Sequence, residues 1–306
     1  TSPDYLGGVQ DIPAMAAVCR AQGVPLLVDN AHGAYLRFLP QNCHPIAQGA
    51  VMCCDSAHKT LPVVTGGAYL HLAHNAPVQD EAAVRGALAL FGSTSPSYLI
   101  LQSLDACNAV LAGDYPRRLA QCCAALEGLR RSLNKAAAAR QCSVPLAVAG
   151  AQQEPMKLTL DAAALGCTGT ALAESLRRAQ MECEYADPRY VVLMFTPENP
   201  PQDYTRLQTA LEQLLAAVPA GLPRPENRAG EFAALQQQAV QRCTIRQAVL
   251  GAQVRVPVHK ALGRVCAMPT VSCPPAIPVA VSGEEITPAA IALMQRYGIE
   301  ELSVLR

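Results

Sequence analysis

Two short segments near the start of the chain carry a concentration of reactive side chains. The first reads Val28-Asp29-Asn30-Ala31-His32-Gly33, and the second reads Asp55-Ser56-Ala57-His58-Lys59-Thr60-Leu61-Pro62. Lys59 is an amine that can react with a carbonyl group, Asp29 is an acid, and each segment also contains an imidazole. This combination indicates covalent chemistry on a small molecule held between the two segments.

Pyridoxal phosphate (PLP) is a cofactor that requires groups of these kinds. It needs a lysine amine for attachment, a carboxylate that keeps its ring nitrogen protonated, and hydroxyl or imidazole donors for its phosphate. Lys59 and Asp29 meet the first two requirements, and Ser56 and His58 meet the third. The glycines of Thr65-Gly66-Gly67 allow a close backbone approach. The sequence therefore predicts a PLP site in which Lys59 and Asp29 face each other across the ring.

Each of these residues also has a purely structural interpretation. An aspartate that ends a strand commonly caps a helix or a turn. A lysine commonly carries a solvated surface charge, and a histidine in an apolar setting is commonly held by hydrogen bonds. The residue chemistry alone leaves both interpretations open for Asp29, Lys59 and His32.

The elements that would position these groups alternate between helix and strand. The apolar spacing predicts a helix over 8–23. Short apolar runs predict buried strands over 24–29, 50–55 and 67–72. Such alternation is typical of an α/β layer with a mostly parallel sheet. Ligands of these sheets bind beyond the carboxyl ends of the strands, where Asp29 and the 56–59 segment would lie.

Three domains are expected along the 306 residues, with boundaries at 1–113, 114–220 and 221–306. The first would hold the α/β layer and a helix over 97–112. The second would be a smaller α/β domain, with helices over 115–139, 169–180 and 202–217 and strands over 156–161 and 190–196. A Pro- and Gly-rich linker over 218–225 leads to a C-terminal domain with one long helix and a turn-rich segment over 266–286.

The composition excludes several classes of protein. Hydrophobic residues make up 51% of the chain and charged residues 16%, which opposes intrinsic disorder. A formal net charge of zero without any basic run opposes nucleic-acid binding. No apolar stretch reaches the roughly 18 residues that a membrane span requires. We therefore expect neither a nucleic acid nor a membrane as a partner.

The 13 cysteines are an odd number and include no CxxC pair. A chain of this length does not need disulfides, and an odd number cannot pair fully within one chain. We interpret them as free thiols in a reducing cytosol and expect a cytoplasmic protein. Neither Cys53-Cys54 nor Cys122-Cys123 has the ligand spacing of a zinc site, so no metal site is predicted.

The motifs together resemble those of the bacterial ornithine/lysine/arginine decarboxylase family, a group of fold-type I PLP enzymes. The family patterns read D-E-A-H-G, S-x-H-K-T-L-P, a glycine-containing strand that ends in L-H, T-S-P-S-Y, A-x-G-R and P-P-G-I-P-x-x-x-P-G-E. The corresponding segments of this chain are 29–33, 56–62, 66–71, 94–98, 261–264 and 274–284. The segments follow the family's order over nearly the whole chain. Their combination is specific for the family, although no single segment is.

The resemblance implies an aminotransferase-like fold-type I large domain, with the smaller α/β and C-terminal domains following it, and PLP as the cofactor. Lys59 would carry the cofactor, and Asp29 would pair with its pyridinium nitrogen. Ser56 and His58 would contact the phosphate. Ala31 would pack against one face of the ring.

Further positions follow from the same resemblance. His32 would lie near the ring and the substrate Cα, where it or the lysine would return a proton. Ser2 would approach the ring hydroxyl. Ser93 or Thr94 would reach a phosphate across a dimer interface, because fold-type I sites form between two subunits. Glu284 would bind the distal cation of the substrate.

The implied reaction is the PLP-dependent decarboxylation of arginine, lysine or ornithine to an amine and CO2, a step of polyamine biosynthesis, by a homodimer or higher homo-oligomer. Two alternatives stay open. One is another fold-type I reaction, such as amino transfer or desulfuration, which would use the same Asp29 and Lys59 pair. The other is a catalytically silent relative that serves as a dimerisation or regulatory module.

The chain departs from the family pattern at several positions. Asn30 replaces a glutamate, and Ala276 and Ser282 replace a glycine and a proline in the late motif. The family also has an N-terminal stretch that would precede Thr1 and would include the first phosphate-binding loop. We therefore expect a fragment that lacks part of the cofactor pocket and binds PLP weakly or not at all.

Overall fold

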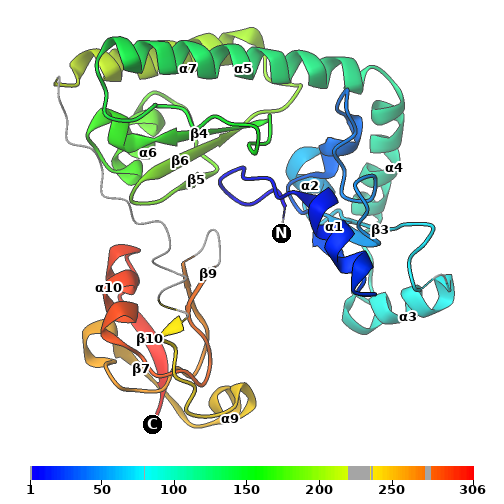
Figure 1. Cartoon of the computed structure of the whole chain (residues 1–306), viewed down its shortest axis with the longest axis vertical. Helices are drawn as coiled ribbons and strands as arrows, with labels where there is room; N and C mark the ends of the chain where they lie inside the picture. Colours follow the sequence, from blue (N-terminus) through cyan, green and yellow to red (C-terminus); the bar gives the residue numbers. More distant parts are fainter. Residues whose placement is uncertain (1, 79, 220–234, 236, 273–276) are drawn as a thin grey trace.

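The computed structural model of the chain describes residues 2–78, 80–219, 235, 237–272 and 277–306. Its helices and strands form three successive groups, which Figure 1 shows in sequence colours. The second and third groups each have a hydrophobic core, and a cluster around Tyr35 and Tyr115 joins the first group to the second. Within the described part of the chain, no helix is both long and apolar enough to cross a membrane. None of the described cysteines forms a disulfide.

The N-terminal group is built on a three-stranded sheet in the order β1-β2-β3. The strands are β1 (Leu27–Asp29), β2 (Met52–Asp55) and β3 (Tyr69–Leu72). β1 and β2 are parallel, whereas β2 and β3 are antiparallel. The expected α/β fold is present, and within this chain the sheet is mixed rather than mostly parallel. The reason is the connection from β2 to β3, which contains only the short helix α2 (Ala57–Thr60) and reverses the chain.

The two faces of this sheet have different surroundings. Helix α1 (Ile12–Ala21) packs on one face, where Ile12 joins Val28 and Cys53 in a buried cluster. The other face leaves Leu27, Asp29 and Cys54 exposed. Because side chains alternate along a strand, Asp29 points to the open face and Asp55 to the buried one.

Three helices lead from this sheet to the second group: α3 (Glu81–Phe91), α4 (Tyr98–Ala112) and α5 (Tyr115–Ala139). The bounds of α5 agree with the expected range, and α4 differs by one residue at its start. Helix α3 was not expected, and it contains no buried residue. Between the first sheet and α5 lies the short 3-10 helix η1 (Ala34–Phe38), which packs on Tyr115 and the start of α5.

The second group is an antiparallel sheet covered by helices. Its strand order is β4-β6-β5, with β4 (Lys157–Asp161), β5 (Tyr185–Ala186) and β6 (Tyr190–Met194). In Figure 1, α5 and α7 (Pro201–Ala217) run across the top of this sheet, and α6 (Gly169–Arg178) follows β4 after the 3-10 helix η2 (Ala162–Leu165). Leucines of the three helices and of β4 fill the core, among them Leu126, Leu133, Leu160, Leu176 and Leu207.

The C-terminal group consists of two antiparallel strand pairs and short helices. The pairs are β7 (Gln253–Pro257) with β10 (Glu301–Leu305) and β8 (Thr270–Ser272) with β9 (Ile277–Ala280). The helices are α9 (Ile245–Leu250), η3 (Val258–Lys260) and α10 (Pro288–Arg296). The one long helix expected here is not found among the described residues. The linker residues 220–225, Cys273 and residues 274–276 of the late motif lie outside the described part.

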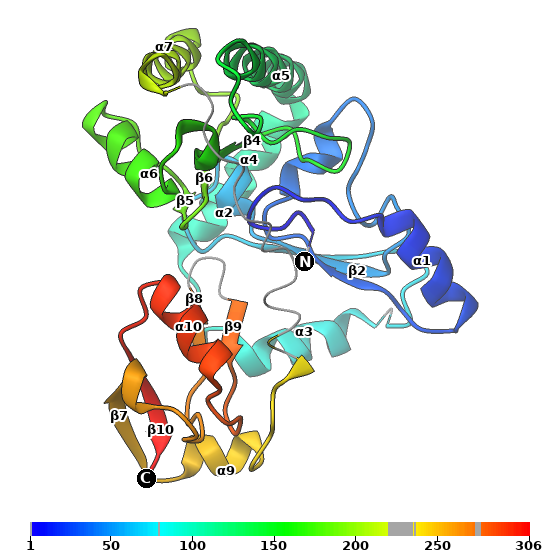
Figure 2. The ribbon, with the colours of Figure 1, turned by 60° about the vertical axis from the view of Figure 1, so that its left-hand side comes forward.

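The N-terminal segment joins the first two groups. The Val9 amide donates to the Gln152 carbonyl at 2.8 Å, and the Lys157 ammonium donates to the Asp4 carbonyl at 2.7 Å. Figures 1 and 2 both show this segment, in dark blue, passing beside the second sheet. It therefore brings Tyr5 to the space between β4 and the carboxyl ends of β1 and β2.

Candidate functional site

Asp29 and Lys59 are positioned by neighbouring parallel strands. Asp29 is the last residue of β1 and stands in register with Cys54 of β2. One residue beyond β2, the chain passes through Ser56 into α2, which carries Lys59. The carboxyl ends of parallel neighbours meet at one edge of a sheet, so both residues belong to the same edge. The Asp29 carboxylate accepts a hydrogen bond from the Ala31 amide at 3.0 Å, in the turn that leads to His32.

A contact between two side chains at this edge joins Lys59 to His32. The Lys59 Nζ atom lies 3.1 Å from His32 Nε2, and the His32 side chain is buried. The Tyr5 ring packs edge-on against His32 with 4.9 Å between ring centroids, and Lys59 Nζ lies 5.9 Å from the centre of the Tyr5 ring. The lysine amine therefore occupies a defined position between an imidazole and an aromatic ring.

His32 is held in its neutral form. Burial lowers its pKa from 6.5 to about 3, and the positive charges of Lys157 and Lys59 act in the same direction. A neutral ring can accept the Lys59 N–H at Nε2, which places its own proton on Nδ1. That Nδ1 atom is buried and has no hydrogen-bond partner among the described residues. The site thus contains a buried N–H group without an acceptor, which is rare in folded proteins.

A second amine, Lys157 of β4, reaches the same region. Its side chain is buried, and its Nζ atom lies 5.8 Å from the centre of the Tyr5 ring. Burial lowers the pKa of Lys157, while the carboxylates of Glu154 and Asp4 oppose that shift. No motif of the sequence marked Lys157. Its signal was a single lysine near the start of the predicted strand over 156–161.

The two residues expected to bind phosphate both flank Lys59. Ser56 precedes α2, and its side chain makes no capping hydrogen bond to that helix. The His58 Nδ1 atom lies 2.9 Å from the Gly67 carbonyl, to which it must donate its proton. His58 can therefore donate to a further group through Nε2 only when the ring is protonated.

Ser2 and Ala31 also lie at this edge. The Ser2 amide donates to the Asp29 carbonyl at 2.9 Å, and its buried hydroxyl accepts from the Gln10 amide at 3.1 Å. Ala31 is half-buried in the turn after β1. The structure thus brings Ser2, Asp29, Ala31, His32 and Lys59 together.

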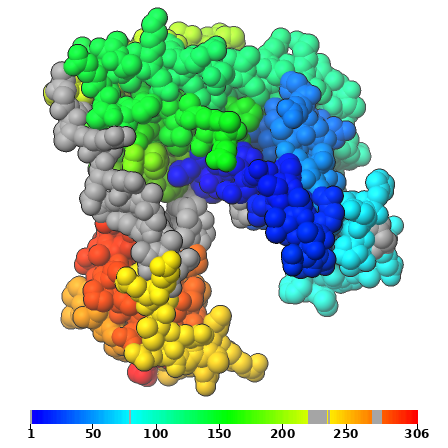
Figure 3. Space-filling view, in the orientation of Figure 1, coloured from blue at the N-terminus to red at the C-terminus, as the bar shows by residue number. Residues whose placement is uncertain are grey.

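Three other expected site residues lie elsewhere in this chain. Ser93 and Thr94 are exposed in the connection between α3 and α4. Glu284 belongs to the C-terminal group, where its carboxylate accepts from the Val281 amide at 2.9 Å. Figure 3 shows open space between that group and the N-terminal segment. Their roles toward a cofactor or substrate stay predictions.

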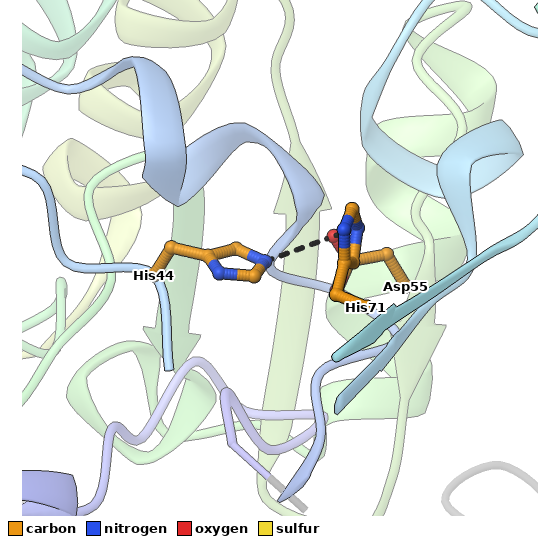
Figure 4. Close-up of side chains that lie close together, drawn as sticks. All are labelled: His44, Asp55 and His71. Atoms are coloured by element: carbon orange, nitrogen blue, oxygen red, sulfur yellow. Dashed lines mark hydrogen bonds and ion pairs between the residues drawn. The ribbon is translucent and has the colours of Figure 1, made fainter. Parts of the chain in front are cut away.

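A buried polar cluster that the sequence analysis missed lies on the opposite face of the first sheet. Asp55 accepts hydrogen bonds from His44 and His71 through one carboxylate oxygen, and Figure 4 shows the three side chains converging. The hydrogen bonds from these histidines and from Asn30 hold the pKa of Asp55 well below its usual range, against the effect of burial. His71 ends the motif segment 66–71, and Asp55 begins the reactive segment 55–62. Nothing in the sequence linked these two residues to His44.

Comparisons with known proteins identify relatives of this chain. The family model for the Orn/Lys/Arg decarboxylase major domain matches residues 1–157. The uncharacterized protein YaaO of Bacillus subtilis is 29% identical over 305 residues, which cover 97% of this chain and 60% of that protein. An arginine decarboxylase of the same organism is 27% identical over 293 residues, which cover 94% of this chain and 58% of that protein. The chain therefore spans about 60% of the length of these relatives.

Solved structures give the same fold. The constitutive lysine decarboxylase of E. coli superposes with a TM-score of 0.71 at 16% identity, over 99% of this chain and 57% of that chain. Lysine decarboxylase A from Pseudomonas aeruginosa gives a TM-score of 0.69 at 17% identity, over 99% of this chain and 56% of that chain. A NifS-like protein from Rickettsia africae gives 0.51 at 14% identity, over 69% of this chain and 59% of that chain. At these identities the likeness concerns the fold, and it agrees with the expected fold-type I architecture.

Proposed function

Because this chain belongs to the Orn/Lys/Arg decarboxylase family, we propose that it is part of a PLP-dependent enzyme that decarboxylates arginine, lysine or ornithine. The observation that carries the proposal is the position of the Lys59 amine, 3.1 Å from the neutral His32 ring and at the same sheet edge as Asp29. The relatives with assigned names are arginine decarboxylases. The whole enzyme would combine this chain with the further length that its relatives have.

The residues present suit PLP. Lys59 offers the amine to which the cofactor attaches, and Asp29 offers a carboxylate for the ring nitrogen. The buried Nδ1–H of His32 lacks an acceptor among the described residues, as expected for a group that meets a polar ligand. Ser56 and His58, on either side of Ala57, would hold the phosphate. Ala31 would lie against the ring, and Ser2 would approach the ring hydroxyl from beside Asp29.

When bound, PLP would withdraw electrons from the substrate Cα and so favour loss of the carboxylate as CO2. The protein's own residues would position the reacting amine. Since the His32 ring stays neutral, its Nε2 atom can accept a hydrogen bond from Lys59 Nζ and hold that amine in place without adding a positive charge beside it. The buried Lys157 ammonium adds positive charge beside Tyr5, where it would attract the substrate carboxylate. Lys59 or His32 would then return a proton to Cα.

We propose the domain division at 1–113, 114–220 and 221–306. The clusters around Leu160 and Val304 each fall within one of these ranges and support the last boundary, whereas the cluster around Tyr35 also includes Tyr115 and so joins the first two domains. We propose that two copies assemble so that the segment with Ser93 and Thr94 faces the partner's site. Support comes from the large apolar side chains exposed on either side of that segment, Leu90, Phe91, Tyr98 and Leu99. Glu284 is proposed to bind the distal cation of the substrate in that assembly.

The absence of disulfides among the described cysteines fits a reducing compartment, so we propose the cytosol. An amine product would make polyamine biosynthesis the metabolic setting.

The experiment supplies PLP and carboxyl-labelled arginine, lysine or ornithine to the full-length protein that contains this chain. Release of labelled CO2 from one of the three is expected, and it identifies the substrate. Lys59→Ala should abolish release, whereas Lys135→Ala, at an exposed position of α5, should not. Covalent PLP binding without CO2 would favour another fold-type I reaction. No binding at all would favour a catalytically silent relative, and either result contradicts the proposal.

A further inference from the structure

The cluster of His44, Asp55 and His71 lies apart from the proposed cofactor site, on the buried face of the first sheet. Asp55 ends β2, His71 belongs to β3, and His44 comes from the connection between η1 and β2. His71 stands in register with Cys53, so its side chain and that of Asp55 project from the same face of adjacent strands. Three chain segments therefore converge on one point, which Figure 4 shows in close-up.

The polar atoms of this cluster face one another. The Asp55 Oδ2 atom lies 3.1 Å from His44 Nε2 and 3.0 Å from His71 Nε2. One ligand atom from each of the three residues falls within 4.8 Å of the others. The two imidazole rings approach from different directions, with an angle of 81° between their planes.

We propose that His44, Asp55 and His71 bind a divalent transition-metal ion, with Zn²⁺ the preferred ion. Two imidazole nitrogens and a carboxylate oxygen are a common ligand set for zinc. Ligands about 2.0–2.2 Å from a tetrahedral ion stand roughly 3.3–3.6 Å apart, so a small outward shift from the two distances in the cluster would admit the ion. The site is independent of PLP and of the proposed decarboxylation.

A supporting contact holds the carboxylate in place. The Asn30 amide Nδ2 donates to Asp55 Oδ1 at 2.7 Å, and both residues are buried. This bond orients the carboxylate and leaves Oδ2 for the ion, as outer contacts of metal ligands commonly do. Cys53 Sγ lies 3.7 Å from His44 Nε2 and 3.8 Å from Asp55 Oδ1, so it packs beside the three converging ligand atoms and is not counted among them.

A cavity gives access to the fourth ligand position. It has a volume of about 410 Å³ and is lined by His44, Asp55 and His71 together with Arg37 and Asn108. The His71 side chain is 39% exposed and forms part of the entrance. Three protein ligands with one position open to water form the arrangement of catalytic rather than purely structural zinc sites.

In the metal-free protein, ring protons occupy the place of the ion. The Ile46 amide donates to His44 Nδ1 at 3.4 Å, which puts the His44 proton on Nε2, directed at Asp55. Metal binding through Nε2 requires the proton of each imidazole to be on Nδ1. The Ile46 bond that His44 gives up is long and therefore weak.

The test measures Zn²⁺ and Co²⁺ binding to the whole chain after treatment with a chelator. Cobalt distinguishes this site from the many thiols, because a thiolate ligand gives an intense near-ultraviolet charge-transfer band and nitrogen and oxygen ligands do not. We expect one ion per chain and visible cobalt bands without the thiolate band. His71→Asn should abolish this binding, and His74→Asn, at an exposed position three residues away, should leave it intact.

Two further variants keep the test decisive if His71→Asn does not fold. His44→Gln should also abolish binding, and Asn30→Ala should weaken it by about 10–100-fold because the carboxylate loses its outer contact. Absence of binding to the wild-type chain would overturn the proposal and leave a hydrogen-bonded carboxylate. Binding that survives both histidine substitutions, or that shows only thiolate bands, would overturn it as well.

Discussion

The amine of Lys59 lies 3.1 Å from Nε2 of His32, and the two residues come from different turns at one edge of the first sheet. The imidazole is buried and neutral, so its Nε2 atom can accept a hydrogen bond from the lysine and fix the position of the amine. The amine of a lysine is the group that reacts with a carbonyl group. This pair links the sequence motifs to the chemistry that we propose.

The acid stability of the protein should depend on His32. Its pKa is about 3 in the folded protein and 6.5 when unfolded, so the unfolded chain binds more protons between these values. Stability is therefore full above pH 6.5 and falls as the pH drops toward 3, by up to about 1.4 kcal/mol per pH unit from this residue. Urea unfolding at several pH values should show a smaller acid loss for His32→Gln. An unchanged slope would contradict the buried neutral ring, and exposed His74→Gln is the control.

Removing the charge of Lys157 should raise the pKa of His32. The Lys157 ammonium is the second-largest cause of the low pKa, after burial. NMR titration of the His32 ring in Lys157→Met should therefore give a value above about 3. Lys135→Met removes a charge from an exposed position and should leave the titration as it is. Equal values in the wild type and in Lys157→Met would mean that Lys157 does not act on the site.

Tyr35→Phe should destabilise the contact between the first two groups. The Tyr35 hydroxyl donates to the carboxylate of Glu154, and both residues are buried. Burial raises the pKa of Glu154, and the loss of this donor leaves the carboxylate with less compensation. We expect a loss of roughly 1.5–3 kcal/mol in the free energy of unfolding, measured in urea. Tyr98→Phe, at an exposed position, should change it by less than about 0.5 kcal/mol, and equal effects would refute the role of this bond.

Gly283 of the late motif should not tolerate a side chain. Its φ angle is +93°, and an added Cβ would lie 2.3 Å from the Cys243 carbonyl oxygen. Gly283→Ala should therefore lower the stability of the C-terminal group by more than about 1 kcal/mol, as measured by thermal unfolding. Gly263→Ala is the matched control, because its φ of +71° brings strain but its added Cβ meets nothing within 4 Å. A smaller loss at 283 than at 263 would contradict the clash.

Sequence patterns predicted the bounds of an element best where the signal is local, such as the spacing of apolar residues or a proline at the start of a helix. Helix α5 could be placed to its ends because its buried residues recur at helical spacing and Pro116 starts its first turn. Helix α3 was not expected from the sequence; it is rich in apolar residues, but the structure buries none of them. One long helix was expected after 220, and the described residues there form the short helices α9 and α10 instead.

The candidate site was predictable only in part, because some of its residues come together through long-range contacts that leave no local pattern in the sequence. Asp29, His32 and Lys59 follow strands whose parallel pairing puts their ends together, and the motifs marked them. Lys157 comes from another group and is brought close by the N-terminal segment, a long-range contact without a local signal. His44, Asp55 and His71 meet because β3 runs antiparallel to β2. The sequence had predicted a mostly parallel sheet.

The attachment point of the cofactor is best examined by reduction with borohydride. The full-length protein that contains this chain is incubated with PLP, reduced, digested and analysed by peptide mass spectrometry. We predict one pyridoxyl group per chain, located on Lys59, and none in Lys59→Ala. A label on Lys157 or another lysine, or an unlabelled protein, would contradict the assignment of Lys59 as the cofactor-binding residue.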